Sequence, residues 1–113
     1  MKTKKELKQA YKQHKPIMGV FQVKNETNGK VLIEGSTDVQ ARWNRHLTEL
    51  RFGSHRNPQL QKDWNEAVSE DFTFTILSTL EYLEGKNVDY AQEVKTLEEI
   101  VVEELGLEEW MRY

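Results

Sequence analysis

The feature that most constrains the fold is a tight turn between two short apolar runs. A turn that ends in Asn28-Gly29 separates residues 17–24 from residues 30–34. Asn-Gly is typical of two-residue hairpin turns, because both positions need backbone angles that these residues adopt readily. We therefore predict a β-hairpin over these two ranges. A third strand is predicted at residues 72–79, where phenylalanine and isoleucine alternate with threonine.

Three helices are predicted around this sheet, at about residues 38–52, 58–68 and 90–105. Apolar residues recur there at helical spacing, and the ends carry residues that usually cap helices. The N-cap candidates are Thr37, Asn57 and Asp89, and the terminal glycines are Gly53 and Gly106. The fold class is therefore α+β, a small three-stranded antiparallel or mixed sheet flanked by helices. The side chains expected in its core include Trp43, Trp64, Phe74, Leu97 and Val101.

At 113 residues, the chain is long enough for one domain with a single core. We divide it into a basic N-terminal helix within residues 1–16 and one domain at residues 17–113. A further short helical turn is expected at residues 107–113, with Trp110 docked on the core.

The absence of cysteine excludes disulfides and cysteine-ligated zinc. No run of 18 apolar residues and no signal-peptide pattern is present, so we expect a cytoplasmic protein without a membrane partner.

Charge is distributed unevenly along the chain. The formal net charge of −3 argues against a general binder of polyanions. Residues 42–62, however, hold five basic residues and one glutamate, whereas residues 81–113 hold ten acidic and three basic residues. We expect the first region to meet phosphate and the second to repel it.

Two candidate site residues lie on the first long helix. Arg42 and His46 are four residues apart, which places them on one helix face beside the apolar stripe. Two cationic groups at a core edge make sense if an anion lies between them. The alternative is that Arg42 pairs with a carboxylate and His46 is a neutral ring, and spacing alone favours this alternative.

The loop after this helix offers a second candidate. His55, Arg56 and Asn57 immediately precede the next helix, whose first N–H groups favour a bound phosphate. The alternative is an ordinary capped loop. On the last helix, Glu98 lies beside the apolar stripe and must stay at the core edge or find a partner. The alternative is that Glu98 is an ordinary acidic residue on the helix surface, like many others in this region.

Together these motifs resemble the GIY-YIG nuclease superfamily. Gly19-Val20-Phe21 corresponds to the first motif, and the run KVLIEGS at residues 30–36 corresponds to the second. The segment from Arg42 to His46 is similar to the family's Arg-x-x-x-His helix, and residues 53–57 fit the next loop. The resemblance is greatest to phage intron-encoded homing endonucleases. The N-terminal nuclease domain of the bacterial excinuclease C subunit is a more distant relative.

The resemblance implies an endonuclease-like site and a role in mobile elements or DNA repair. Arg42 and His46 would act on the phosphate and its protons, and Glu98 would hold a single Mg²⁺ or Mn²⁺ ion, with Glu99 as its nearest rival. The partner would be nucleic acid, DNA in preference to RNA. The residues expected to contact nucleic acid are Gly19, Arg45, His55, Arg56 and Asn57.

The chain departs from the family at both motif tyrosines. Phe21 replaces the first, and Leu32 the second by an ungapped count, which puts Glu34 at the motif glycine. A one-residue gap puts Ile33 at the tyrosine instead, and neither choice restores a hydroxyl. Loss of a general acid or base typically slows a reaction about 10²–10⁴-fold.

Three functions therefore remain open. They are an endonuclease with altered base chemistry, a module that binds nucleic acid with weak or lost hydrolysis, and a protein-interaction domain that uses the acidic last helix. We favour the second of these.

Overall fold

The computed structural model describes residue 3 and residues 15–67, 71–83 and 87–113. It contains a three-stranded sheet in the order β2-β1-β3, with β1 at Met18–Asn25, β2 at Val31–Ser36 and β3 at Phe72–Leu80. Both strand pairs are antiparallel, which confirms the α+β class and gives an antiparallel sheet. The predicted N-terminal basic helix lies almost wholly outside the described residues.

The hairpin forms where the Asn-Gly pair predicted it. Gly29 has φ = 77°, which a residue with a side chain rarely adopts, and its N–H donates to the Asn25 carbonyl at 2.8 Å. At the other end of β1, the backbones of β1 and β3 come very close, since a Cβ on Gly19 would lie 2.0 Å from the Ser78 carbonyl oxygen. The register with β3 shifts between Val20 and Phe21, one residue beyond this contact.

The three predicted helices are present as α2 at Val39–Phe52, α3 at Pro58–Glu66 and α4 at Tyr90–Leu105. Asn57 and Asp89 cap α3 and α4 with their side chains, as expected. The cap of α2 is Asp38 rather than Thr37, because the Asp38 carboxylate accepts the N–H of Ala41. Among the described residues, no helix is long and apolar enough to cross a membrane.

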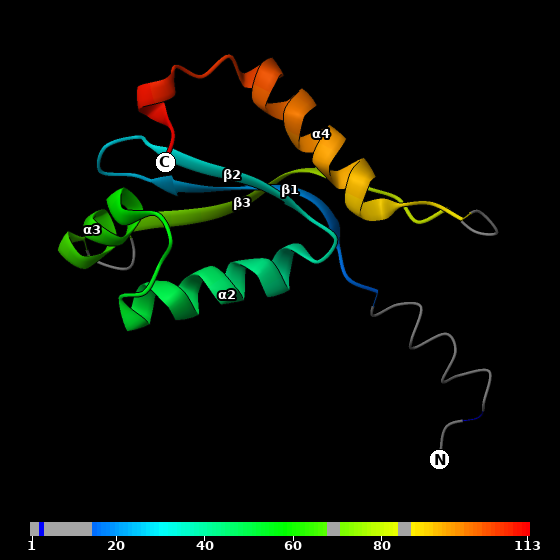
Figure 1. Cartoon of the computed structure of the whole chain (residues 1–113), viewed down its shortest axis with the longest axis horizontal. Helices are drawn as coiled ribbons and strands as arrows, with labels where there is room; N and C mark the ends of the chain where they lie inside the picture. The colour runs from blue at the N-terminus through cyan, green and yellow to red at the C-terminus, as the bar shows by residue number, and fades with distance from the viewer. Residues whose placement is uncertain (1–2, 4–14, 68–70, 84–86) are drawn as a thin grey trace.

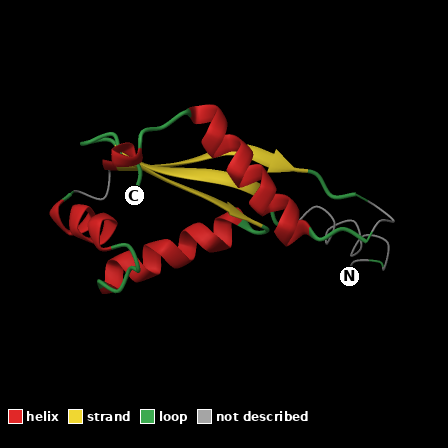
Figure 2. Ribbon diagram, turned by 45° about the horizontal axis from the view of Figure 1, so that its top comes forward, coloured by secondary structure: helices red, strands yellow, loops and turns green. Residues whose placement is uncertain are grey.

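The helices lie on opposite faces of the sheet. Figure 1 shows α4 on one side of the strands and α2 on the other, and the turned view in Figure 2 agrees. Strand residues alternate between the two faces, so each helix meets its own core cluster. The buried residues of the α4 face are Val20, Val31, Ile33 and Val101, and those of the α2 face are Phe21, Val23 and Val39.

The core is narrower than the sequence indicated. Val101 is buried as predicted, but Trp43, Trp64, Phe74 and Leu97 are only half-buried. A three-stranded sheet with single helices on each face is too small to enclose large side chains at its margins. The aromatic side chains instead pack on one another, with the rings of Trp43 and Phe74 stacked at 5.5 Å.

The last residues depart from expectation in a similar way. A short 3₁₀ helix forms at Glu109–Met111, but Trp110 is 65% exposed, so the prediction that it docks on the core is wrong. The chain is anchored instead by Tyr113, whose N–H donates to the Val31 carbonyl and whose hydroxyl donates to Asp63.

Candidate functional site

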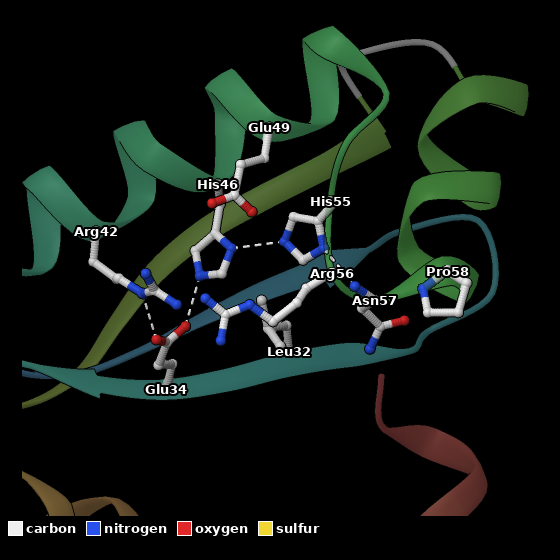
Figure 3. Close-up of a pocket in the computed structure, with 9 residues that line it drawn as sticks. All are labelled: Leu32, Glu34, Arg42, His46, Glu49, His55, Arg56, Asn57 and Pro58. Carbon is white, nitrogen blue, oxygen red and sulfur yellow. Dashed lines mark hydrogen bonds and ion pairs between the residues drawn. The ribbon is translucent and has the colours of Figure 1, made fainter.

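A pocket of about 380 Å³ lies on the α2 face of the sheet, between the end of β2, helix α2 and the start of α3. Figure 3 shows its lining side chains pointing toward one another from these elements. They are Leu32, Glu34, Arg42, His46, Glu49, His55, Arg56, Asn57 and Pro58. Five of the predicted site residues are therefore brought together with Leu32, although they come from a strand, a helix and a loop.

Glu34 is the centre of this constellation. One carboxylate oxygen accepts the Nε–H of Arg42 at 2.5 Å, and the other contacts His46 Nε2 at 2.6 Å. The side chains of Glu34 and Arg42 are 23% and 25% exposed, so the ion pair is partly shielded from water. Hydrogen bonds to an ionised acceptor at these distances are the strong kind. Of the two arrangements considered for Arg42, the structure therefore has the one in which Arg42 pairs with a carboxylate.

A chain of hydrogen bonds continues from Glu34 through two imidazole rings. His46 Nδ1 lies 2.8 Å from His55 Nε2, and the Asn57 N–H donates to His55 Nδ1 at 3.0 Å. Because His55 Nδ1 accepts a proton donor, a neutral His55 carries its proton on Nε2 and donates to His46 Nδ1. A neutral His46 then donates from Nε2 to Glu34. One arrangement of protons thus satisfies all three contacts, with both rings neutral.

The pKa shifts agree with this arrangement. Burial would raise the pKa of Glu34, but the hydrogen bonds from His46 and Arg42 outweigh it and leave that pKa below its usual value. Burial lowers the pKa of His55, and the positive charge of Arg42 lowers it further. The site therefore favours an ionised Glu34 beside a neutral His55.

The remaining basic residues lie at the rim. Arg45 is 63% exposed and pairs with Glu49 at 3.2 Å, while the exposed Arg56 lines the pocket mouth. Asn57 accepts the Leu60 N–H with its side chain and so fixes the start of α3 beside His55. An anion approaching the pocket would meet Arg56 before it met Arg42.

The two motif positions lie on the α2 face of the sheet. Leu32 lines the pocket, and the fully buried Phe21 lies beneath it, with its ring edge-on to His46 at 6.1 Å between centroids. Gly19 does not line the pocket, and pairs with Ser36 and Thr79 at the far end of β1. The close contact between its backbone and β3 is enough to explain why this residue is glycine, without a role in ligand binding.

Glu98 does not line the pocket. It projects from α4, and its carboxylate accepts the Gly35 N–H at 2.7 Å, one residue beyond Glu34. In the described part of the chain, Arg42 pairs with Glu34, and no ion pair joins it to Glu98. No cluster of three or more metal-ligating side chains occurs among the described residues.

Three pocket residues were absent from the predicted site, namely Glu34, Glu49 and Pro58. The signal for Glu34 was available, since residues two apart in a strand share a face and Leu32 was already assigned. A signal for Glu49 was available too, since it lies three residues after His46 and seven after Arg42 and so shares their helix face.

Comparison with known proteins gives concordant results in sequence and structure, although no family model matches. The chain is 34% identical over 64 residues to intron-associated endonuclease 1 of Enterobacteria phage T4; the match covers 57% of this chain and 26% of that protein. The catalytic domain of homing endonuclease I-TevI superposes with a TM-score of 0.62 at 27% identity, covering 79% of this chain and 88% of that one. A mutant form of that domain gives 0.63, with 80% and 84% covered.

Proposed function

Since this chain is a domain of the GIY-YIG nuclease superfamily, we propose that it contacts the phosphate backbone of nucleic acid, with phosphodiester hydrolysis weak or lost. The observation that carries the proposal is the pocket itself. It gathers Arg42, His46 and Arg56 with a helix start, yet has Phe21 and Leu32 where water activation needs hydroxyl groups. DNA is the proposed partner, because the similar proteins are named as intron and homing endonucleases.

Each side chain has a separate part in this proposal. Arg56 and Arg45 offer exposed positive charge that attracts the backbone, and counterions released from the phosphates drive the binding. Arg42 provides a guanidinium that opposes charge on a phosphate oxygen. His46 and His55 form a hydrogen-bonded pair of rings that can pass a proton from His55 through His46 toward Glu34.

Glu98 is the proposed holder of a Mg²⁺ or Mn²⁺ ion. It is half-buried, and one of its oxygens is engaged by the Gly35 N–H. A single carboxylate is a sufficient donor set for Mg²⁺, because this ion keeps several of its waters in proteins. When bound, such an ion supplies positive charge for the developing charge on a phosphate.

The binding proposal is tested by fluorescence anisotropy with labelled DNA and RNA across a salt series. We expect binding to weaken steeply with salt and Arg56→Ala to reduce the salt slope by about one unit, as loss of one phosphate contact does. Lys95→Ala is the matched control, because Lys95 is also exposed and basic but lies on α4. An equal effect of both variants, or no binding at low salt, would leave a protein partner for α4 as the better explanation.

Hydrolysis is tested by nicking of a supercoiled plasmid in Mg²⁺ or Mn²⁺. We expect little or no nicking by the unmodified chain. Vigorous cleavage that persists in Glu98→Ala and Arg42→Ala would show that the chemistry lies elsewhere on the molecule.

A further inference from the structure

The pocket already contains an anion that belongs to the chain. The two oxygens of Glu34 each take one partner, Arg42 Nε and His46 Nε2, as the two non-bridging oxygens of a phosphodiester would. Figure 3 shows the carboxylate between the two donors, on the β2 side of the pocket. We call the position defined by the donors of Arg42 and His46 the anion seat.

We propose that Glu34 is a built-in occupant of the anion seat, so that phosphate enters this seat only when the carboxylate is displaced or absent. The inference rests on the proposed function in one respect, namely that nucleic-acid phosphate is the ligand from which Glu34 protects the seat. The chain then binds nucleic acid through the basic residues at the rim, Arg45 and Arg56, while Glu34 keeps phosphate out of the anion seat.

Backbone geometry keeps the carboxylate in place. Glu34 lies within β2 and pairs with Phe21 of the central strand, while the next residue is locked from the opposite face by the contact between Gly35 and Glu98. A Cβ on Gly35 would lie 2.7 Å from a Val94 side-chain carbon, so α4 packs directly on the backbone here. The Glu34 side chain therefore starts from a fixed point directed at the α2 face.

The surroundings favour an anion at this position. His46 is 5% exposed and donates toward the seat, and Arg42 is largely covered. Removing Glu34 would leave a guanidinium and a donating imidazole without their acceptor, which is costly in a partly buried site. An added anion can repay that cost, because the pocket remains open to solvent through the mouth lined by Arg56.

The chain supplies a matched control for charge. Glu49 lines the same pocket, and its side chain is 24% exposed against 23% for Glu34. Its partner is Arg45, which is 63% exposed, rather than Arg42. Glu49→Ala therefore removes the same charge from the same pocket but leaves the anion seat occupied.

The test measures binding of inorganic phosphate to the wild type, Glu34→Ala and Glu49→Ala, by calorimetry and by the phosphate dependence of the melting temperature. We expect Glu34→Ala to bind phosphate about ten-fold or more tightly than the wild type, a difference of ~1.4 kcal/mol or more, because the like charge of Glu34 no longer opposes the anion. Phosphate should raise the melting temperature of Glu34→Ala most. Glu49→Ala should gain much less, and adding Arg42→Ala to Glu34→Ala should abolish the gain.

Three outcomes would overturn the inference. They are equal phosphate affinity in the wild type and Glu34→Ala, an equal gain in Glu49→Ala, and a gain that survives Arg42→Ala. If Glu34→Ala does not fold, Glu34→Gln replaces it, because that change keeps the side-chain volume. The wild type gives an independent answer: a phosphate-dependent shift of the Arg42 Nε–H and His46 ring proton signals would mean that the seat is open.

Failure of the inference differs from failure of the proposed function. Salt-dependent DNA binding without any gain of phosphate affinity in Glu34→Ala would retain the function and reject the occupied seat. A clear gain in Glu34→Ala by a chain that ignores DNA would retain the occupied seat and reject nucleic acid as the ligand.

Discussion

On the α2 face of the sheet, charged groups and imidazole rings form a continuous network above Phe21, whereas on the α4 face aliphatic side chains pack against Val20 and Ile33. Both faces are made from the same strands. In β2, Leu32 and Glu34 serve the first face, and Val31 and Ile33 serve the second. Stability therefore depends on apolar contacts on both faces, and on the α2 face it depends on pH-sensitive contacts as well.

The difference explains why Glu98 is separated from the pocket. Its helix belongs to the aliphatic face, and its carboxylate reaches the edge of β2 rather than Arg42. A chemical role for both Glu98 and Arg42 requires a ligand that bends around the edge of β2. The four predictions below test this difference between the two faces.

The largest effect should come from Phe21→Ala. This side chain is fully buried beneath the pocket, so its truncation should lower the free energy of unfolding by about 3–5 kcal/mol. Denaturant unfolding measures the loss. Ile76→Ala on β3 is the reference, since Ile76 is 37% exposed and should lose far less. Similar losses for both would mean that the α2 face is not a packed core.

Restoring the motif hydroxyls should have the next largest effect. Phe21→Tyr combined with Leu32→Tyr should raise nicking, by about 10²-fold if one functional acid or base is regained. Adding Glu34→Gly should raise it further by clearing the anion seat, and Glu98→Ala should remove the gain. Plasmid nicking in Mg²⁺ measures all four proteins. No gain in any of them would mean that more than hydroxyl groups has been lost.

Gly35→Ala tests the α4 face alone. The added Cβ would meet a Val94 side-chain carbon at 2.7 Å and the Val94 carbonyl oxygen at 2.9 Å, so α4 must shift outward. Such overpacking costs about 1–3 kcal/mol. In NMR spectra, signals from α4 should move while the His46 and His55 ring signals stay in place. Movement of both sets would show that the two faces are coupled.

Acidification should have the smallest effect, and it should act through the titratable groups of the α2 face. The pKa values of Glu34 and His55 are lowered in the fold, from ordinary values of 4.5 and 6.5. Each contribution to stability is therefore complete above the ordinary value and lost as pH falls through the folded one. Unfolding should become easier from about pH 6.5 downward, first through His55 and then through Glu34. Glu34→Gln should flatten the lower part of the curve, and an unchanged curve would contradict the ion pair.

The sequence predicted most of the backbone and part of the site. Asn28-Gly29, Asn57-Pro58 and the glycines after two helices are local signals, and each was found where expected. The pairing of Arg42 with Glu34 joins a helix to a strand, so no short stretch of sequence signals it. It depends on which strand residue lies opposite the helix, and only the assembled sheet determines that.

The half-buried tryptophans have a related explanation. Helical spacing correctly indicates which side of α2 and α3 faces inward, but it contains no information on how wide the sheet beneath will be. Trp43 and Trp64 lie near the margin of a three-stranded sheet, where they pack against Phe74 and Phe72 instead of being enclosed. The exposure of the two tryptophans therefore depends on the width of the sheet on which α2 and α3 pack.

The hydrogen bond from the Gly35 N–H to Glu98 also affects whether copies of the protein can associate through the edge of the sheet. β2 is an outer strand, and an outer strand with unpaired N–H and C=O groups can recruit a strand from another molecule. Here Glu98 occupies the Gly35 N–H, and at the opposite end of β2 the Val31 carbonyl accepts the N–H of Tyr113. Both ends of this edge are thus blocked by the chain itself. Glu98→Ala should free the Gly35 N–H at one end of this edge, and so make β2 a place where copies of the protein can join.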